Sequence, residues 1–95
     1  MPAQDPVAAS ELKVYPNPVV ANYFTIQYDS PASQQAQVSI FDSASTLIKQ
    51  IMVNLNSGAN NVVVDINYIY DGPYIVSFQP ENGQKSTTRI IISRL

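Results

Sequence analysis

Short apolar runs that alternate with other residues recur along this chain, and they limit what it can fold into. The clearest run follows Gly72 and Pro73, where Tyr74, Val76 and Phe78 fall on one face of an extended backbone. No window carries the 3.6-residue apolar repeat of an amphipathic helix. The pattern therefore predicts β-strands, each with one face that must be buried.

About seven such runs are separated by turn-forming residues at intervals of roughly 8–12 residues. This spacing predicts an all-β fold, and we expect an immunoglobulin-like antiparallel β-sandwich of about seven strands with Greek-key connections. The expected strands lie within residues 11–15, 23–28, 35–40, 47–53, 62–66, 74–79 and 85–93. In the strands before Gly72, the residues expected to face the core are Phe24, Ile26, Tyr28, Ala36, Val38, Ile40, Val62, Val64 and Ile66.

Four local signals refine this expectation. Apart from Lys49 and Gln50, residues 47–53 would place apolar side chains on both faces of a strand, which predicts a β-bulge or an edge position. Residues 54–61 are mostly polar and are expected to connect two strands. Asn82 and Gly83 predict a hairpin turn with positive φ angles. Tyr74 resembles the tyrosine of a tyrosine corner, whose hydroxyl bonds to the backbone a few residues upstream.

Composition narrows the classes of function. A chain of 95 residues makes one domain. Only 13% of its residues are charged, and its net charge of −2 gives no positive surface field that would attract nucleic acid. The chain has no cysteine and no histidine, which excludes disulfides, thiol nucleophiles, a Ser-His-Asp triad and the usual zinc sites. No apolar run reaches the ~18–20 residues that would cross a bilayer.

Five of the seven acidic residues are spread over different turns, which favours local turn hydrogen bonds over a catalytic carboxylate pair. We therefore expect no enzyme activity and no cofactor, while a calcium site built from two loops stays open. These acidic residues are Asp29, Asp42, Asp65, Asp71 and Glu81.

The first ten residues are small, polar and proline-containing, and we expect residues 1–10 to be a linker before a domain over residues 11–95. They lack the regions of a signal peptide, so we expect a piece of a longer protein with Met1 as an expression start. The two prolines in Tyr15–Pro18 predict a stiff kink that hands the chain from one sheet to the other.

Five segments, taken together and in order, resemble a known family over about residues 12–95. They resemble the C-terminal sorting domain of cargo that the type IX (Por) secretion system of Bacteroidetes exports. The segments are Val14–Pro18, Phe24–Ile26, Val38–Asp42, Gly72–Val76 and Arg89–Ile92.

The resemblance implies that the domain is a sorting signal at the C-terminus of an exported passenger. We expect the domain to be a monomer. The resemblance also implies passage through the periplasm to the outer membrane and the cell surface, with a shuttle protein and a sortase as partners. The linker is the expected region of sortase cleavage, in particular Ala8, Ala9 and Ser10. Two departures concern residue type: Ser45 and Thr46 replace a Gly and a basic residue, and Tyr68 and Tyr70 replace smaller polar ones.

The family's motif positions carry over to three groups of residues. For the first two groups, fold maintenance is the favoured interpretation. In the last group, Ile90, Ile91 and Ile92 cannot all face the core, so Ile91 is either covered by another element or exposed for a partner. If exposed, it would form the recognised surface with Lys85 and Arg89. The groups are Tyr15, Pro16, Asn17 and Pro18; Gly72 and Tyr74; and Lys85, Arg89, Ile90, Ile91, Ile92, Arg94 and Leu95.

Two other classes of function stay open. Tyr68, Tyr70 and Tyr23 could form an aromatic platform for carbohydrate, or the loop could pack its rings against the rim of the sandwich. Alternatively, the domain could be a spacer within a secreted multidomain protein. The basic residues near the end could also guard an exposed strand edge.

Overall fold

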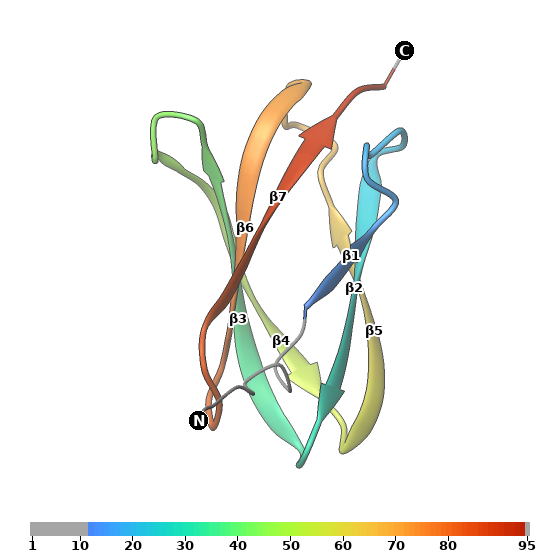
Figure 1. The fold of residues 1–95 in the computed structure, drawn as a ribbon, viewed down its shortest axis with the longest axis vertical. Helices are drawn as coiled ribbons and strands as arrows, with labels where there is room; N and C mark the ends of the chain where they lie inside the picture. Colours follow the sequence, from blue (N-terminus) through green and yellow to red (C-terminus); the bar gives the residue numbers. More distant parts are fainter. Residues whose placement is uncertain (1–11, 95) are drawn as a thin grey trace, which may run out of the picture.

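The computed structural model describes residues 12–94, which form seven β-strands and no helix (Figure 1). The strands are β1 (Lys13–Tyr15), β2 (Tyr23–Ser30), β3 (Gln34–Asp42), β4 (Leu47–Leu55), β5 (Gly58–Asp65), β6 (Gly72–Pro80) and β7 (Ser86–Ile92). They pair into an antiparallel sheet in the order β1-β2-β5 and a second in the order β4-β3-β6-β7. The predicted all-β, immunoglobulin-like sandwich is confirmed.

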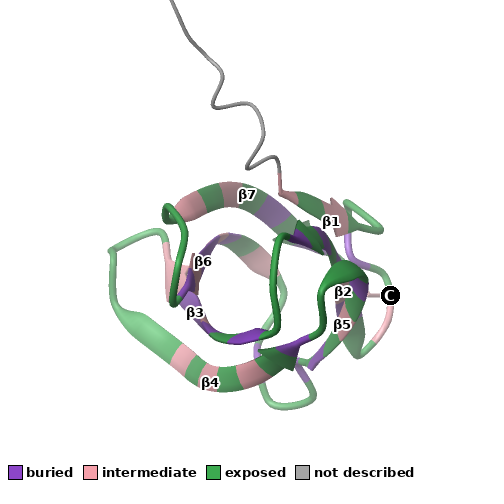
Figure 2. Ribbon diagram, turned by 90° about the horizontal axis from the view of Figure 1, so that it is seen from below, coloured by how far each residue is buried: buried purple, intermediate pink, exposed green. Residues whose placement is uncertain are grey.

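Alternation along the strands places one face of each sheet in a shared core (Figure 2). Every residue predicted to face inward is buried, except that Val62 is half-buried. Across the sandwich, the ring of Tyr28 in β2 meets that of Phe78 in β6, with centroids 4.7 Å apart. Burying a side chain as large as Phe78 contributes about 1.5–3 kcal/mol. In a chain without cysteine, such contacts must hold the two sheets together.

Strand β4 has both of the features that its mixed pattern predicted. It lies at the edge of the four-stranded sheet. Its pairing with β3 shifts, because Ile40 pairs with Lys49 while Phe41 pairs with Leu47. Ile48 is therefore the additional residue of a β-bulge.

The connection predicted over residues 54–61 is wrong in extent, because β4 continues to Leu55 and β5 begins at Gly58. The buried side chain of Asn60 explains the difference. Its Nδ2 donates to the carbonyls of Asn56 and Gly58, both at 2.9 Å, and its Oδ1 accepts the N–H of Asn56 at 2.8 Å. These bonds stabilise a short chain reversal. Most of the polar residues that predicted a loop therefore lie in strands.

The β6–β7 connection also differs from the prediction. It covers residues 81–85, and neither Asn82 nor Gly83 has a positive φ. A loop of this length does not require the two-residue turn with positive φ angles. Side chains hold it instead: the N–H of Asn82 donates to Gln34 Oε1 at 2.7 Å, and Gln79 Nε2 donates to the carbonyl of Gly83 at 2.9 Å.

The chain changes sheets directly after β1. Tyr15 ends β1 in the three-stranded sheet, whereas Val19 forms a parallel bridge to Ile92 in the four-stranded sheet. The peptide bonds that precede Pro16 and Pro18 are both cis. The change of sheet between Tyr15 and Val19 confirms the predicted hand-over.

Candidate recognition surface on the last strand

Strand β7 presents one isoleucine to solvent and buries its two neighbours. Ile90 and Ile92 are 1% exposed, whereas Ile91 is 53% exposed. Successive strand residues face opposite sides of a sheet, so Ile91 lies on the outer face. Of the two alternatives that the sequence left open, exposure of Ile91 is the one found in the described structure.

The outer face around Ile91 combines apolar side chains with a cation. Pro73 pairs with Ile91, and Ile75 pairs with Arg89, so the four side chains are cross-strand neighbours. We call these four residues the β7 patch. A shallow hollow of about 340 Å³ lies over Pro73, Ile75 and Arg89 and reaches Asp42 at the end of β3.

Two cations, one in this patch and one just before β7, have no ionic partner in the described part of the chain. Arg89 is exposed on β7, and Lys85 is exposed in the β6–β7 connection. Within residues 12–94, neither side chain makes an ion pair or a hydrogen bond. Both charges are therefore available to another molecule.

The free edge of β7 is covered by the segment Tyr15–Val19. Asn17 acts as a substitute strand residue, because its Nδ2 donates to the carbonyl of Arg89 at 3.1 Å and its Oδ1 accepts the N–H of Ile91 at 3.2 Å. Val19 continues the cover, donating to the carbonyl of Ile91 at 2.7 Å and accepting the N–H of Ser93 at 2.8 Å. An added strand would have to displace these bonds to pair with this part of β7.

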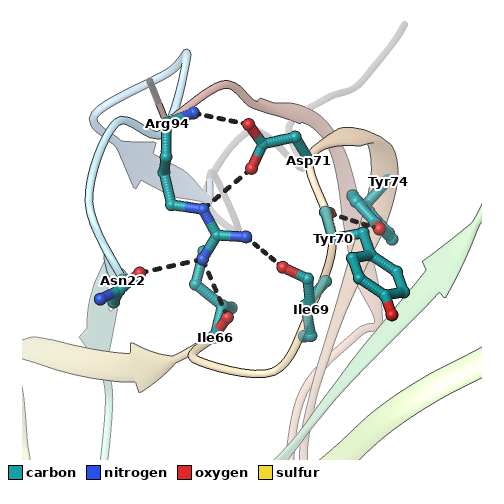
Figure 3. Close-up of polar contacts among 7 residues, drawn as sticks. All are labelled: Asn22, Ile66, Ile69, Tyr70, Asp71, Tyr74 and Arg94. Carbon is teal, nitrogen blue, oxygen red and sulfur yellow. Dashed lines mark hydrogen bonds and ion pairs between the residues drawn. The ribbon is translucent and has the colours of Figure 1, made fainter.

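Arg94 lies beyond β7 and directs its guanidinium into the fold (Figure 3). Its Nε donates to Asp71 Oδ1 and its backbone N–H to Asp71 Oδ2, both at 2.9 Å. Nη1 donates to Asn22 Oδ1 and to the carbonyl of Ile66, both at 3.1 Å, and Nη2 donates to the carbonyl of Ile69. Arg94 thus joins the end of the chain to the β1–β2 and β5–β6 connections.

The environment of Asp71 reflects this contact. The hydrogen bond from the Arg94 side chain, followed by that from the Arg94 backbone, lowers the pKa of the Asp71 carboxyl below its ordinary value of 3.8. A lowered pKa means that the folded protein favours the charged carboxylate. The two opposite charges therefore compensate each other at this end of the sandwich.

Tyr74 and Gly72 shape the start of β6. The Tyr74 hydroxyl donates to the carbonyl of Tyr70 at 2.6 Å, which confirms the predicted tyrosine corner. Burial, followed by the charge of Asp42, raises the pKa of the Tyr74 hydroxyl above 10.0. Gly72 has a φ of 147°, a region that favours glycine. Both residues thus have visible roles in maintaining the fold.

The β3–β4 turn contains the one non-glycine residue with positive φ among residues 12–94, Ser45, at 66°. Asp42 Oδ1 accepts the N–H groups of Ala44 and Thr46 across this turn, both at 2.9 Å. Ser45 stands where the family resemblance leads us to expect a glycine. It therefore takes up a left-handed conformation that glycine would adopt at lower cost.

The tyrosines of the β5–β6 connection do not pack against the rim of the sandwich, so that alternative is wrong. Tyr68 is 99% exposed and Tyr70 is 88% exposed, because Ile69 between them takes the buried position at 7%. Tyr23 is 46% exposed and lies in β2, on the outer face of the three-stranded sheet.

The remaining predicted site residues are distributed as follows. Tyr15 is exposed, and its hydroxyl donates to Asn61 Oδ1 at 3.3 Å. Pro16 and Pro18 are exposed on either side of Asn17. Ala8, Ala9, Ser10 and Leu95 lie outside the described residues.

Sequence reasoning missed two members of the β7 patch, Pro73 and Ile75. A signal for Ile75 was present, because it alternates with the inward-facing Tyr74 and Val76 and must face outward. Nothing local showed that the outer face beside it belongs to β7. That information comes from strand order.

Within the described residues, no three acidic side chains gather as the ligands of a metal ion would. That part of the chain also contains no helix long and apolar enough to span a membrane.

Comparison with known proteins identifies the family. A family model for the secretion system C-terminal sorting domain matches residues 13–93, which include all seven strands. Comparisons with curated proteins and with solved structures returned no match. Because the family model covers most of the chain, this protein belongs to the C-terminal sorting domains of type IX secretion.

Proposed function

We propose that this domain, joined to the C-terminus of a passenger, directs that passenger through the periplasm to the outer membrane and the cell surface. Family membership supports the sorting role. The partners would be a shuttle protein of the secretion machinery, which recognises the folded domain, and a sortase, which removes it. The chain itself would be a substrate of the sortase and perform no catalysis.

The observation that carries the proposal is the exposure of Ile91 between two buried isoleucines. An exposed aliphatic side chain that adjoins Ile75 and Pro73 offers apolar area to a partner. The unpaired charges of Arg89 and Lys85 favour acidic groups at the margin of the partner's surface. We therefore assign recognition to the β7 patch together with Lys85, which precedes the same strand.

The covered edge of β7 favours one mode of docking. Asn17 and Val19 already occupy the outward hydrogen-bonding groups between Arg89 and Ser93. Strand addition to that part of β7 would cost those bonds before forming new ones. A partner that binds through the outer side chains pays no such cost, so side-by-side docking is the mode we propose.

Cleavage is proposed within the linker, at or near Ala8, Ala9 and Ser10. The support is that the first described strand begins at Lys13 and the family match also begins there. A cut before Lys13 would leave all seven strands intact. The bond would be identified by mass spectrometry of the passenger that the cells release, whose new C-terminus should lie within residues 3–10.

The sorting role is tested by fusing the whole chain to an unrelated periplasmic protein in a cell with type IX secretion. We expect the fusion to reach the surface or the medium, and the same protein without the domain to remain in the periplasm. Surface proteolysis and fractionation would measure the distribution. Equal periplasmic retention of both proteins would contradict the proposed function.

The assigned surface is tested separately by reversing its charges. Lys85→Glu combined with Arg89→Glu should reduce surface delivery, whereas Lys13→Glu, an exposed change on the other sheet, should not. Denaturant unfolding of the isolated domains would show that all variants fold. If delivery of the doubly reversed variant equals that of the parent, the charges are not part of the recognised surface.

A further inference from the structure

The β5–β6 connection carries two aromatic rings that the fold does not use. Tyr68 and Tyr70 are 99% and 88% exposed, the highest fractions among the large hydrophobic residues of the described chain. The N–H of Ile69 donates to the carbonyl of Ile66 at 3.1 Å, which closes a turn with Tyr68 near its tip. Ile69 enters the core and leaves the two rings directed outward. We call residues 67–70 the tyrosine tip.

Three sets of hydrogen bonds fix the backbone beneath these rings, and Figure 3 shows the two sets made by Arg94 and Tyr74. Arg94 donates to the carbonyls of Ile66 and Ile69, and the Tyr74 hydroxyl donates to the carbonyl of Tyr70. The backbone N–H of Asn67, at the base of the turn, donates to the carboxylate of the preceding strand's last residue at 3.0 Å. Exposed rings on a fixed backbone lose little conformational freedom when a ligand binds.

The groups around the rings offer hydrogen bonds, and the two carboxylates among them each have a cation nearby. The Asp65 carboxylate accepts the N–H of Asn67, and Lys49 Nζ donates to the backbone carbonyl of Asp65 at 2.5 Å. The side-chain amide of Asn67 has no partner within residues 12–94. Asn22 uses its amide oxygen on Arg94 and keeps its Nδ2 donors available. The Asp71 carboxylate is compensated by Arg94 in an ion pair of 2.9 Å. This end of the sandwich therefore suits an uncharged polar ligand.

We propose that the tyrosine tip binds a neutral saccharide chain. The C–H face of a sugar ring is apolar and can cover an aromatic ring, while sugar hydroxyls bond to side-chain amides. An anionic membrane surface would require free cations, and the guanidinium of Arg94 is occupied within the fold.

The position of the tip is compatible with such a role in a fused protein. It lies at the end of the sandwich where the described chain ends, away from the start of β1, to which a passenger would be joined (Figure 1). It is also distinct from the β7 patch, so a bound saccharide would not replace the proposed sorting role. The two proposals can fail independently.

The test uses the 95-residue chain in native affinity electrophoresis with soluble neutral polysaccharides: a β-1,4-glucan, a β-1,3-glucan, an α-1,4-glucan and a galactomannan. We expect at least one of them to retard the domain. The Tyr68→Ala/Tyr70→Ala variant should bind at least about tenfold more weakly than the parent, because it loses both ring contacts. The Tyr68→Phe/Tyr70→Phe variant keeps the rings and should retain most of the binding.

Two measurements separate specific binding from adsorption or misfolding. A Met52→Ala/Val63→Ala control removes exposed hydrophobic side chains elsewhere (53% and 64% exposed) and should be retarded like the parent. Because the chain has no tryptophan, saccharide binding should also change its tyrosine fluorescence, and this response should vanish in the double alanine variant.

Three outcomes would overturn the inference. The first is an absence of retardation by every polysaccharide, and the second is equal retardation of the parent and the double alanine variant. The third is binding only to phosphatidylglycerol vesicles or to a protein, with no saccharide bound. Normal sorting of the double alanine variant would leave the proposed function intact in each case.

Discussion

Two arginines five positions apart in the C-terminal segment have opposite surroundings. Arg89 extends from the outer face of β7 and has no ionic partner among residues 12–94. Arg94 donates through all three of its guanidinium nitrogens, to Asp71, to the amide of Asn22 and to two backbone carbonyls. A sequence-based view places both in one basic strip, but the fold gives each a different task.

The short terminal segment combines an exposed surface with the bonds that hold that surface in place. Side chains at Arg89 and Ile91 are available outside, while Asn17 and Val19 bind the backbone beneath them. Arg94 then attaches the end of the segment to two connections. Deleting the whole segment would remove both tasks at once, so single substitutions are needed to separate them.

The largest difference should come from truncating the two arginines. Arg94→Ala removes bonds to two backbone carbonyls and to Asn22 and should lower the free energy of unfolding by about 2 kcal/mol. Arg89→Ala touches no described partner and should change it by less than about 0.5 kcal/mol. Denaturant titration of both variants measures this. Equal losses of unfolding free energy in the two variants would show that Arg94 contributes no more to stability than Arg89.

The next effect concerns the connection that Arg94 holds. Tyr74→Phe removes the hydrogen bond to the Tyr70 carbonyl and should cost about 1 kcal/mol of unfolding free energy. The matched control, Tyr70→Phe, removes a hydroxyl from an 88% exposed ring and should leave stability unchanged. A Tyr74→Phe variant as stable as the parent would show that the tyrosine corner contributes nothing measurable.

A smaller effect is expected at the edge of β7. Asn17→Ala removes two exposed hydrogen bonds and should cost about 0.5–1 kcal/mol. Hydrogen exchange sharpens the test, because the amide of Ile91 should exchange faster in this variant while that of Ile90 should not. Asn61→Ala, which loses only a contact with the Tyr15 hydroxyl, is the control. Unchanged protection of Ile91 would contradict the role of Asn17 as a substitute strand residue.

The smallest expected effect is a dependence of the unfolding free energy on pH. Because the folded-state pKa of Asp71 is lowered from 3.8, its ionisation adds stability that is present above pH 3.8. That contribution is lost as the pH falls from 3.8 through the folded-state pKa. Stability measured between pH 5.5 and 2.5 should therefore fall more steeply in the parent than in Asp71→Asn. Parallel curves would show that the pair with Arg94 has no effect on stability.

Alternation and turn residues were sufficient to predict the sandwich and the inward residues, because both depend on local pattern. They failed over residues 54–61, where the bonds of Asn60 turn a polar stretch into strand ends. They also failed at Gly83, where contacts with other elements replace the predicted turn geometry. In both places the deciding interactions are made by individual side chains that a pattern does not reveal.

The candidate site was predictable only in part. Alternation along the strand showed that Ile91 faces the side opposite to Ile90 and Ile92. Strand order was needed to show that the outer face, on which Ile91 lies, is uncovered. The task of Arg94 depends on Asn22 and Asp71, which are 72 and 23 positions away along the chain. Contacts at such separations leave no local signal, so the two arginines could not be distinguished from the sequence.

The most direct test of the account is surface delivery of a fused reporter that carries Ile91→Asp, compared with Val63→Asp. Both changes place a charge at an exposed aliphatic position of a strand, 53% and 64% exposed, but on opposite sheets. With folding verified for both domains, we predict that Ile91→Asp leaves the reporter in the periplasm and that Val63→Asp delivers it normally. Normal delivery of the folded Ile91→Asp variant would contradict the claim that the outer face of β7 is the surface that is read.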